Sequence, residues 1–275
     1  MKDDAVALQA RTIRSLAVEM VHRANASHIG GSLSMVEVLA VLYFELMRVD
    51  PAKPDWADRD RLLLSKGHCC STLYACLALK GFFPKEELLD YGKDGTRLLA
   101  HASHYVPGVE LSTGSLGHAL PVAAGIALSA KRKGESWQVY VILSDGELDE
   151  GSNWEAILFS GHHKLDNLTV IVDNNKIQSL GATSEILNLE PMEDKFEAFH
   201  WDVQRFDGHD IGQVRHALSM RGDESCGKPR MLIADTIKGK GVDFMEHQLS
   251  WHYRSPGEEE LQAALQQLKE GINNA

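Results

Sequence analysis

The sequence lacks the features of a membrane protein, a disulfide-rich protein or a metal-thiolate site. No apolar run approaches the ~20 residues of a membrane-spanning helix. The N-terminus, MKDDAVALQARTIRSLAVEM, has early acidic residues and a helical period, unlike a signal or transit peptide. Cysteine is scarce and shows no CxxC spacing, so we expect buried free thiols in a reducing cytosol rather than zinc or redox chemistry: Cys69, Cys70, Cys76 and Cys226. The sequence therefore predicts a soluble, cytoplasmic protein.

Charge and missing motifs exclude further classes. The formal net charge is −11, and no run of like charges marks an interaction tail. Neither nucleic acid nor an anionic membrane attracts an acidic protein, so we expect no nucleic-acid partner and no membrane partner. Walker, HExxH and nucleophile-elbow motifs are also missing from the sequence.

What the sequence does have is an alternation of apolar strands and helical periods. Strand patterns occupy residues 61–65, 138–144, 168–173, 202–206 and 230–236, and helical patterns occupy 118–132, 151–164, 191–200, 210–221 and 257–271. This alternation predicts an α/β fold, a parallel sheet flanked by helices on both faces, and a single domain over residues 1–275. Ligands of such sheets bind at the carboxyl ends of the strands.

Two segments outside this alternation carry further predictions. Ser34 and Glu37 form a capping-box signature before an amphipathic helix that runs from Val36 to Met47. Residues 82–113 have no clear period and many Gly, His and Ser residues, which indicates a long loop. Long loops inside compact domains are usually functional.

Two consecutive strands end in polar dipeptides, the first in Asp145-Gly146 and the second, about 30 residues later, in Asn174-Asn175. Mg²⁺ prefers hard oxygen ligands, which Asp145 can give as a carboxylate, Asn175 as an amide and Ile177 as a backbone carbonyl. Gly146 has no side chain, so its N–H can approach a diphosphate where the next helix begins. Ordinary turns are the alternative. A hairpin would need a strand directly after Asp-Gly, whereas a helical pattern follows.

These residues carry a resemblance to a known family. The spacing DG-x(28)-N is similar to the thiamine diphosphate motif, and DGELDEGSNWEA…KLDNLTVIVDNN resembles transketolase. Further segments resemble transketolase in the same order: ANASHIGGSLSMVEVL, LLLSKGHCCSTLYACLALKGFF, PGVELSTGSLGHALPVAAGIALSAK and ADTIKGKG…SWHYRSP. The resemblance covers about residues 10–256, and only the N-terminal, diphosphate-binding part of that enzyme. It implies the thiamine diphosphate-binding fold, with thiamine diphosphate and Mg²⁺ (or Ca²⁺ or Mn²⁺) as cofactors.

The resemblance also implies roles for histidines that, taken singly, would be ordinary loop residues. His68 matches the histidine near the diphosphate. His28 and His101 match those that line the channel for the donor and acceptor sugars. His252 matches a histidine near the reacting carbon, and His247 is an alternative for that role.

Other positions of the same resemblance are expected at the cofactor or near it. Gly114 and Leu116 lie in the loop that matches the family's contact with the middle of the cofactor. Gly146 is expected at the diphosphate, and Glu147 is expected to bind the cofactor. Glu150 matches an acidic residue near the subunit interface that takes part in proton communication between sites. A helix N-terminal carboxylate is the alternative for Glu150.

Some positions depart from the family pattern or leave their role open. His118 replaces the commoner glutamine, and both Ser144 and Tyr253 stand where the family usually has glycine. Lys238 and Lys240, in IKGKG, could bind an anion or form a solvated turn.

The resemblance implies a two-chain enzyme that moves a two-carbon ketol unit from a ketose to an aldose. The glutamate that activates the aminopyrimidine belongs, in the family, to the next domain, which no segment here matches. We therefore expect a C-terminal transketolase subunit with the pyrimidine-binding domain as partner, in an α₂β₂ assembly acting on sugar phosphates or an unusual or sulfonated sugar. The alternatives are a deoxyxylulose phosphate synthase-like enzyme, the α chain of a 2-oxo-acid dehydrogenase, or a non-catalytic structural half.

Overall fold

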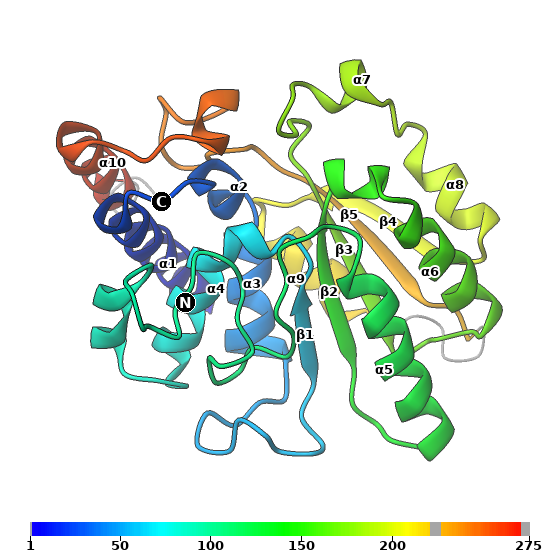
Figure 1. Cartoon of the computed structure of the whole chain (residues 1–275). Helices are drawn as coiled ribbons and strands as arrows, with labels where there is room; N and C mark the ends of the chain where they lie inside the picture. The colour runs from blue at the N-terminus through cyan, green and yellow to red at the C-terminus, as the bar shows by residue number, and fades with distance from the viewer. Residues whose placement is uncertain (1, 221–226, 271–275) are drawn as a thin grey trace.

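The computed structural model describes residues 2–220 and 227–270. Within them lies a parallel five-stranded sheet with the order β1-β2-β3-β5-β4 (Figure 1). The strands are β1 Arg61–Leu64, β2 Val139–Ser144, β3 Leu168–Asn174, β4 Asp202–Asp207 and β5 Arg230–Asp235. Each strand lies where the apolar pattern predicts one, so the predicted parallel α/β sheet is confirmed.

Helices cover both faces of this sheet (Figure 1). Successive side chains of a strand point to opposite faces, so Leu62 and Leu64 join one buried core and Leu63 joins the other. The first core is closed by α1 Lys2–Ala24, α3 Val36–Val41, α4 Cys70–Lys80 and α9 Ile211–Ser219. The second is closed by α5 Ala119–Lys133, α6 Gly151–His162 and α8 Met192–Ala198.

The remaining elements are short or peripheral. They are α2 Ile29–Leu33, α7 Thr183–Ile186, α10 Glu258–Glu270, the π-helix η1 Leu42–Leu46 and the 3₁₀ turns η2 Gly67–Cys69, η3 Lys85–Asp90, η4 Gly146–Asp149 and η5 Leu249–His252. Apart from η3, residues 82–113 form no helix or strand, as predicted. Thr113, at the end of this long loop, donates from its hydroxyl to the Leu64 carbonyl at 2.6 Å, which fastens the loop to the end of β1.

The predicted capping box at Ser34 and Glu37 is wrong. Helix α3 begins after Met35, and the Ser34 hydroxyl donates to the Asp173 carboxylate at 2.5 Å. Glu37 does not turn back to the helix N-terminus, because its carboxylate accepts two hydrogen bonds from Arg14 of α1, at 2.6 and 2.7 Å. Both side chains are buried, and pairing a buried charge outweighs a local cap.

Two expectations about the chain as a whole have partial outcomes. Among the residues described, no helix combines the length and the apolar content that crossing a membrane requires. Cys69, Cys70 and Cys76 are buried free thiols, as predicted, whereas Cys226 lies outside the described residues.

Candidate active site

A cavity of about 220 Å³ lies at the carboxyl edge of the sheet, where the segments that follow β1, β2, β3 and β5 meet the start of α2 and the long loop. Most of the predicted site residues line it: His28, His68, His101, Gly114, Leu116, Asp145, Gly146, Asn175, Ile177 and His252. Residues far apart in the sequence therefore converge on one cavity. Two predicted site residues, Glu147 and Glu150, do not line it.

Four histidines form a cluster in this cavity. The ring of His28 lies 5.0 Å from His68, 6.0 Å from His101 and 4.9 Å from His252, measured between centroids. The His28 backbone N–H donates to the His252 carbonyl at 3.0 Å, which ties the segment before α2 to η5. His247, the alternative to His252, is exposed and lines no part of the cavity.

The surroundings favour the neutral form of these histidines. Burial, together with repulsion from His68 and His101, lowers the pKa of His28 to about 4. Burial is also the first cause of the low pKa of His68, about 4, and of His252, about 3. At neutral pH each of these rings therefore has one N–H donor and one bare nitrogen, so each can give or accept a proton.

The three predicted metal ligands also line the cavity. Asp145 is only 1% exposed, and its carboxylate accepts the N–H groups of Gly146 at 2.8 Å and Lys176 at 2.5 Å. The Asn175 amide oxygen accepts the Ile177 N–H at 3.2 Å. These bonds orient the oxygen atoms and leave each with a further lone pair.

The chemistry of this donor set fits a divalent cation. Burial, followed by the charge of Asp173, raises the pKa of Asp145 to about 6, and a bound cation would offset that cost. No cluster of three or more His, Cys, Asp or Glu side chains that could hold a metal occurs in the described part of the chain. The predicted set consists of one carboxylate, one amide and one carbonyl, which suits Mg²⁺ shared with a diphosphate.

Gly146 lines the cavity as predicted, and the approach of its N–H to a diphosphate stays a prediction. A Cβ atom here would lie 2.6 Å from the Cβ of Gln178, so glycine lets the segment after β3 lie across it. However, its N–H donates to Asp145 Oδ1 at 2.8 Å, and the turn η4 intervenes before α6 begins. In this structure that N–H is therefore engaged within the protein rather than directed at a ligand.

Glu147 has a structural position instead of a place on the cavity wall. Its side chain is fully buried and accepts from the Ser65 hydroxyl, from the Gly117 N–H at 2.9 Å and from the Ser144 N–H at 3.3 Å. The cofactor contact expected for Glu147 stays a prediction. Glu150 is exposed at the N-cap of α6, a position that leaves open both an interface role and a helix-terminal charge.

The departures from the family pattern have plain local consequences. The Ser144 hydroxyl accepts the Glu147 N–H at 3.2 Å, so its hydrogen-bonding need is met. His118 is exposed before α5 and does not reach the cavity. Tyr253 donates from its hydroxyl to the Ser179 carbonyl at 2.6 Å, which fastens η5 to the segment after β3.

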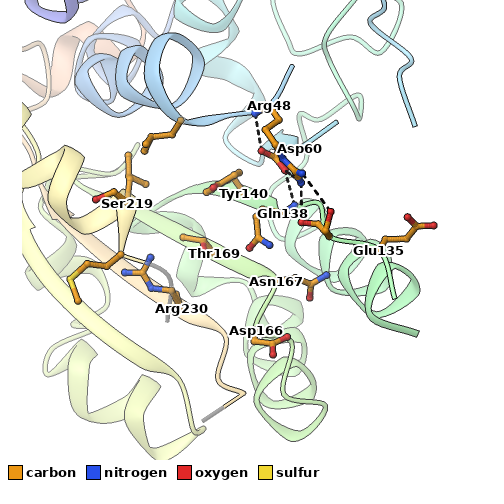
Figure 2. A pocket seen from close by; sticks show the side chains of 14 residues that line it. Arg48, Asp60, Glu135, Gln138, Tyr140, Asp166, Asn167, Thr169, Ser219 and Arg230 are labelled. Atoms are coloured by element: carbon orange, nitrogen blue, oxygen red, sulfur yellow. Dashed lines mark hydrogen bonds and ion pairs between the residues drawn. The ribbon is translucent and has the colours of Figure 1, made fainter. Parts of the chain in front are cut away.

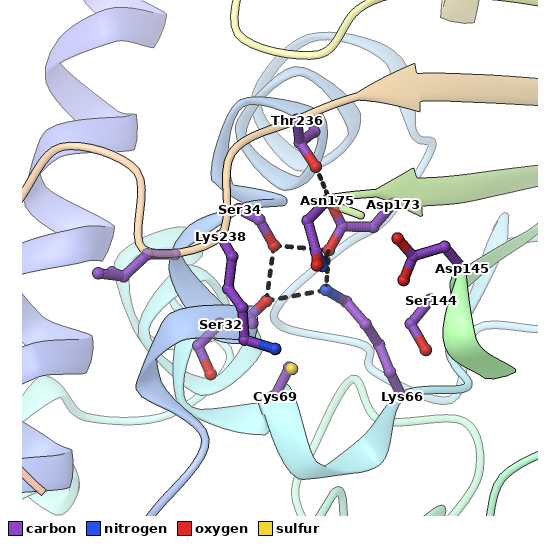
Figure 3. A network of polar contacts seen from close by, with 12 residues as sticks. Ser32, Ser34, Lys66, Cys69, Ser144, Asp145, Asp173, Asn175, Thr236 and Lys238 are labelled. Atoms are coloured by element: carbon purple, nitrogen blue, oxygen red, sulfur yellow. Dashed lines mark hydrogen bonds and ion pairs between the residues drawn. The ribbon is translucent and has the colours of Figure 1, made fainter. Parts of the chain in front are cut away.

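A buried polar network, which the sequence pattern does not reveal, lies beside the cavity (Figure 3). Its centre is Asp173 at the end of β3, which accepts from the ammonium of Lys66, the hydroxyls of Ser34 and Thr236, and the amide of Asn175. The network joins four segments at the carboxyl edge. Asp173 could have been found, because a carboxylate near the end of a mainly apolar, buried strand needs a buried partner.

Lys238 is a second buried lysine at the cavity, with a side chain 2% exposed. Its ammonium donates to the Ile177 carbonyl at 2.9 Å and lies 3.2 Å from His252 Nδ1. Burial lowers the pKa of Lys238. The ammonium of Lys240 lies 3.8 Å from the Glu246 carboxylate, outside the cavity. Lys238 is therefore the one residue of the IKGKG segment that lines the cavity.

A larger cavity of about 620 Å³ opens at the opposite, amino edge of the sheet (Figure 2). Tyr140, Thr169 and Arg230 stand in register on neighbouring strands there, and Arg48 pairs with Asp60 at 3.1 Å. None of the predicted site residues lines this cavity. Ligands of parallel α/β sheets bind at carboxyl ends, so we assign function to the smaller cavity.

Comparison with known proteins decides the family. The family described as "Transketolase, thiamine diphosphate binding domain" matches residues 6–274. The chain belongs to the transketolase family. It is 46% identical, over 96% of its own length and 96% of the relative's, to the 6-deoxy-6-sulfo-D-fructose transketolase subunit of Clostridium sp. (strain MSTE9). It is 41% identical, over 99% of its length and 96% of the relative's, to an apulose-4-phosphate transketolase subunit of Phocaeicola vulgatus.

Solved transketolases share the fold. The transketolase of Campylobacter jejuni superposes with a TM-score of 0.89 at 32% identity, over 96% of this chain. This chain spans 42% of that longer transketolase chain. The chain thus matches one part of the longer enzyme, whereas it matches the two transketolase subunits over nearly their whole length.

Proposed function

We propose that this chain is the thiamine diphosphate-binding subunit of a two-chain transketolase that moves a two-carbon ketol unit from a ketose to an aldose. The observation that carries the proposal is that four histidines and three oxygen donors line one cavity at the carboxyl edge. Two relatives that match along nearly their whole length are named as transketolase subunits, which supports it. On this proposal residues 1–275 act as one diphosphate-binding domain.

The cofactors of the proposal are thiamine diphosphate and Mg²⁺, with Ca²⁺ or Mn²⁺ as possible replacements for the metal. When bound, thiamine diphosphate supplies the carbon nucleophile and the electron sink of ketol transfer. Asp145, Asn175 and Ile177 would hold the metal. His68 would contact the diphosphate, and Leu116 would pack against the middle of the cofactor.

His28, His101 and His252 would bind the sugar and move protons at its hydroxyl and carbonyl oxygens. Their low pKa values keep the rings neutral at physiological pH, so each can act as an acid or as a base. In His252, Nδ1 faces the Lys238 ammonium at 3.2 Å and must be the acceptor, which assigns the proton to Nε2. His252 can therefore donate a hydrogen bond from Nε2.

The partner of the proposal is a C-terminal transketolase subunit that carries the pyrimidine-binding domain, in an α₂β₂ assembly. Val122 of α5 and Leu158 and Phe159 of α6 are large exposed apolar side chains, here named the α5–α6 patch. Glu150 is the N-cap of the same helix α6, which suits its predicted place near a subunit interface. The buried free thiols support a cytoplasmic location.

The substrates of the proposal are a ketose and an aldose with a terminal phosphate or sulfonate. The test begins with calorimetric titration of the chain with thiamine diphosphate in the presence of Mg²⁺, where we expect saturable binding that chelation abolishes. A coupled assay of the chain with its partner, on a panel of ketoses, aldoses and 2-oxo acids, then identifies the reaction. Turnover of 2-oxo acids without ketol transfer would overturn the transketolase assignment, and lack of cofactor binding would overturn the proposal as a whole.

A further inference from the structure

His101 is the member of the histidine cluster that comes from the long loop, residues 82–113. Its side chain is exposed, whereas the next two residues, Ala102 and Ser103, are 3% and 2% exposed. Apart from η3, residues 82–113 have no helix or strand whose regular hydrogen bonds would fix the backbone. The position of the His101 ring therefore depends on the groups that pair with the backbone of residues 101–103.

One side chain, Tyr74 of helix α4, holds this backbone on both sides of Ala102. Its hydroxyl donates to the His101 carbonyl at 2.8 Å and accepts the Ser103 N–H at 3.0 Å. These roles are fixed, because a carbonyl can only accept a hydrogen bond and an N–H can only donate one. Tyr74 is 0% exposed, and burial raises its pKa, so the hydroxyl keeps the proton that it donates.

The neighbouring contacts join the long loop to the turn that carries His68. The 3₁₀ turn η2 runs directly into α4, so His68 and Tyr74 belong to one continuous helical stretch. The Gly67 carbonyl of this turn accepts the Ala102 N–H at 3.0 Å. A Cβ atom at Gly67 would lie 2.3 Å from the Thr113 carbonyl oxygen, so glycine lets the end of the loop lie against the turn. The loop and the turn are therefore held at a fixed spacing beside the cavity.

The ring of His101 has close neighbours on the cavity side. A Cβ atom at Gly114 would lie 3.2 Å from Cδ2 of this ring, so glycine there leaves room for the imidazole. The ring centroid lies 6.0 Å from that of His28. A shift of the backbone at residues 101–103 would move the imidazole relative to both neighbours. Misplacing a catalytic group by about 1 Å can cost about a hundredfold in rate.

We propose that Tyr74 is a positioning residue, whose hydroxyl holds the His101 imidazole in place for the sugar through its two hydrogen bonds to the backbone beside that histidine. This inference rests on the proposed function, in which His101 binds the sugar and moves its protons. Tyr74 lines no part of the cavity, so it acts through His101. Its hydroxyl should therefore matter for ketol transfer but not for cofactor affinity, and only while the His101 ring is present.

The test compares Tyr74→Phe with the control Tyr91→Phe. Tyr91 is also buried, its ring centroid lies 6.2 Å from that of Tyr74, and its hydroxyl contacts Cys70 Sγ at 3.9 Å instead of the backbone beside His101. In the assay of the chain with its partner, we expect kcat/KM of Tyr74→Phe to fall about ten- to a hundredfold. Its affinity for thiamine diphosphate with Mg²⁺, measured by calorimetry, should stay at the wild-type value. Tyr91→Phe should match the wild type in both measurements.

Two further measurements separate positioning from a general loss of structure. In the His101→Ala background, Tyr74→Phe should cause no further loss of ketol transfer, because the effects of two residues that act as one unit do not add. In the histidine region of the NMR spectrum, the His101 signal can be assigned from its absence in His101→Ala. This signal should move in Tyr74→Phe and stay in place in Tyr91→Phe. Folded and unfolded chains in slow exchange give separate signals, so a loss of stability does not hide the result.

A tyrosine that only supports the fold would give a different pattern. If Tyr74→Phe lowered ketol transfer by the same factor with and without the His101 ring, or weakened thiamine diphosphate binding as much as ketol transfer, the assignment would be overturned. A wild-type chain that neither binds thiamine diphosphate nor transfers ketol units with its partner would overturn the proposed function as well. Normal ketol transfer in both the wild type and Tyr74→Phe would remove only the role of the tyrosine.

Discussion

Two buried carboxylates at the ends of neighbouring strands have opposite electrostatic surroundings. Burial alone would raise the pKa of Asp173, but Lys66 and the hydrogen bonds from Ser34 and Thr236 hold it below its usual range. Asp145, at the next strand, has only backbone N–H donors, and burial raises its pKa to about 6. Asp173 is therefore satisfied within the protein, whereas Asp145 gains from a cation.

Replacing Asp145 tests the metal site at the level of one residue. Asp145→Asn keeps the size of the side chain and removes the one carboxylate of the predicted ligand set. We expect Mg²⁺-dependent binding of thiamine diphosphate to weaken at least about a hundredfold, in line with the ~3–5 kcal/mol typical of broken buried charge pairs. Calorimetry measures the affinity, and circular dichroism checks the fold. The control is Asp166→Asn, at the opposite edge of the sheet; equal affinity in the two variants would remove the metal assignment.

Replacing Lys66 tests the buried network. Lys66→Met leaves the Asp173 charge buried without its partner, so we expect the free energy of unfolding to fall by about 3–5 kcal/mol. Adding Asp173→Asn removes the orphaned charge. The double variant should therefore lose less than the sum of the two single variants, because the two residues are in contact. Urea denaturation of the cofactor-free chain measures the free energy of unfolding of the two single variants and the double variant. If the losses of the single variants simply added up in the double variant, the two residues would not be coupled.

At the scale of elements, strands and helices were predictable and their order in the sheet was not. The strand LTVIVD, for example, is mainly apolar, with Thr169 and Asp173 as its polar residues, because helices cover both of its faces. Local pattern does not encode which strands become neighbours, so the position of β4 at the edge beyond β5 could not be predicted. The capping box failed for a related reason, since Glu37 pairs with Arg14 of a helix that local pattern could not place beside it.

The candidate site was predictable where a motif marks it. Asp145 and Asn175 follow from strand ends alone, and the histidine cluster follows from the resemblance. The buried partners of Glu147 could not be predicted, because Ser65 and Gly117 lie on other segments and only the folded chain shows them. The buried state of Lys238 likewise depends on long-range packing.

Loops carry two of the clustered histidines, and their replacement separates cofactor binding from sugar chemistry. His28→Ala and His101→Ala should keep thiamine diphosphate affinity, because neither residue is among the predicted metal or diphosphate ligands. Ketol transfer with the partner should fall about 10²- to 10⁴-fold, the usual contribution of a positioned acid or base. The control is His104→Ala, an exposed histidine of the same loop as His101 that does not line the cavity. Normal turnover in both variants would return these histidines to ordinary loop residues.

The whole molecule should lose stability in mild acid. Burial lowers the pKa of His28 and His68 to about 4 and of His252 to about 3, so between pH 6.5 and 4 the unfolded chain binds more protons than the folded one. The free energy of unfolding should thus fall as pH drops through that window. Burial raises the pKa values of Asp145 and Glu147, so these two groups favour the folded chain as the pH drops. They are outnumbered by the three histidines.

Denaturant titrations of the cofactor-free chain at pH 7.5, 6.5 and 5.5 measure this dependence. His68→Gln should flatten it, because this variant removes one of the desolvated rings. His104→Gln, which changes an exposed ring, should leave the curve unchanged. If the free energy of unfolding of the wild type stayed constant or rose toward pH 5.5, the histidine cluster would not control its pH dependence.

The last prediction concerns assembly. Val122, Leu158 and Phe159 of the α5–α6 patch are 41%, 57% and 38% exposed. Helices α5 and α6 pack against each other, and large apolar side chains exposed on packed helices are candidates for an interaction site. We expect the chain alone to self-associate, to bind thiamine diphosphate and to show no ketol transfer, because the activating carboxylate for the pyrimidine ring belongs to the proposed partner. Mixing with that partner should give a defined complex in light scattering together with activity.

A charge in the patch should oppose this assembly. Leu158→Asp puts a carboxylate where the partner would bury a leucine. We expect both the affinity for the partner and the ketol transfer of the mixture to fall at least tenfold. A tenfold change corresponds to ~1.4 kcal/mol, and burial of an unpaired charge costs more than that. Leu89→Asp, at a leucine of η3 that is 51% exposed, is the matched control and should assemble normally. Thiamine diphosphate binding should be the same in both variants, since neither residue lines the cavity. Robust ketol transfer by the single chain, without any second polypeptide, would refute the two-chain enzyme.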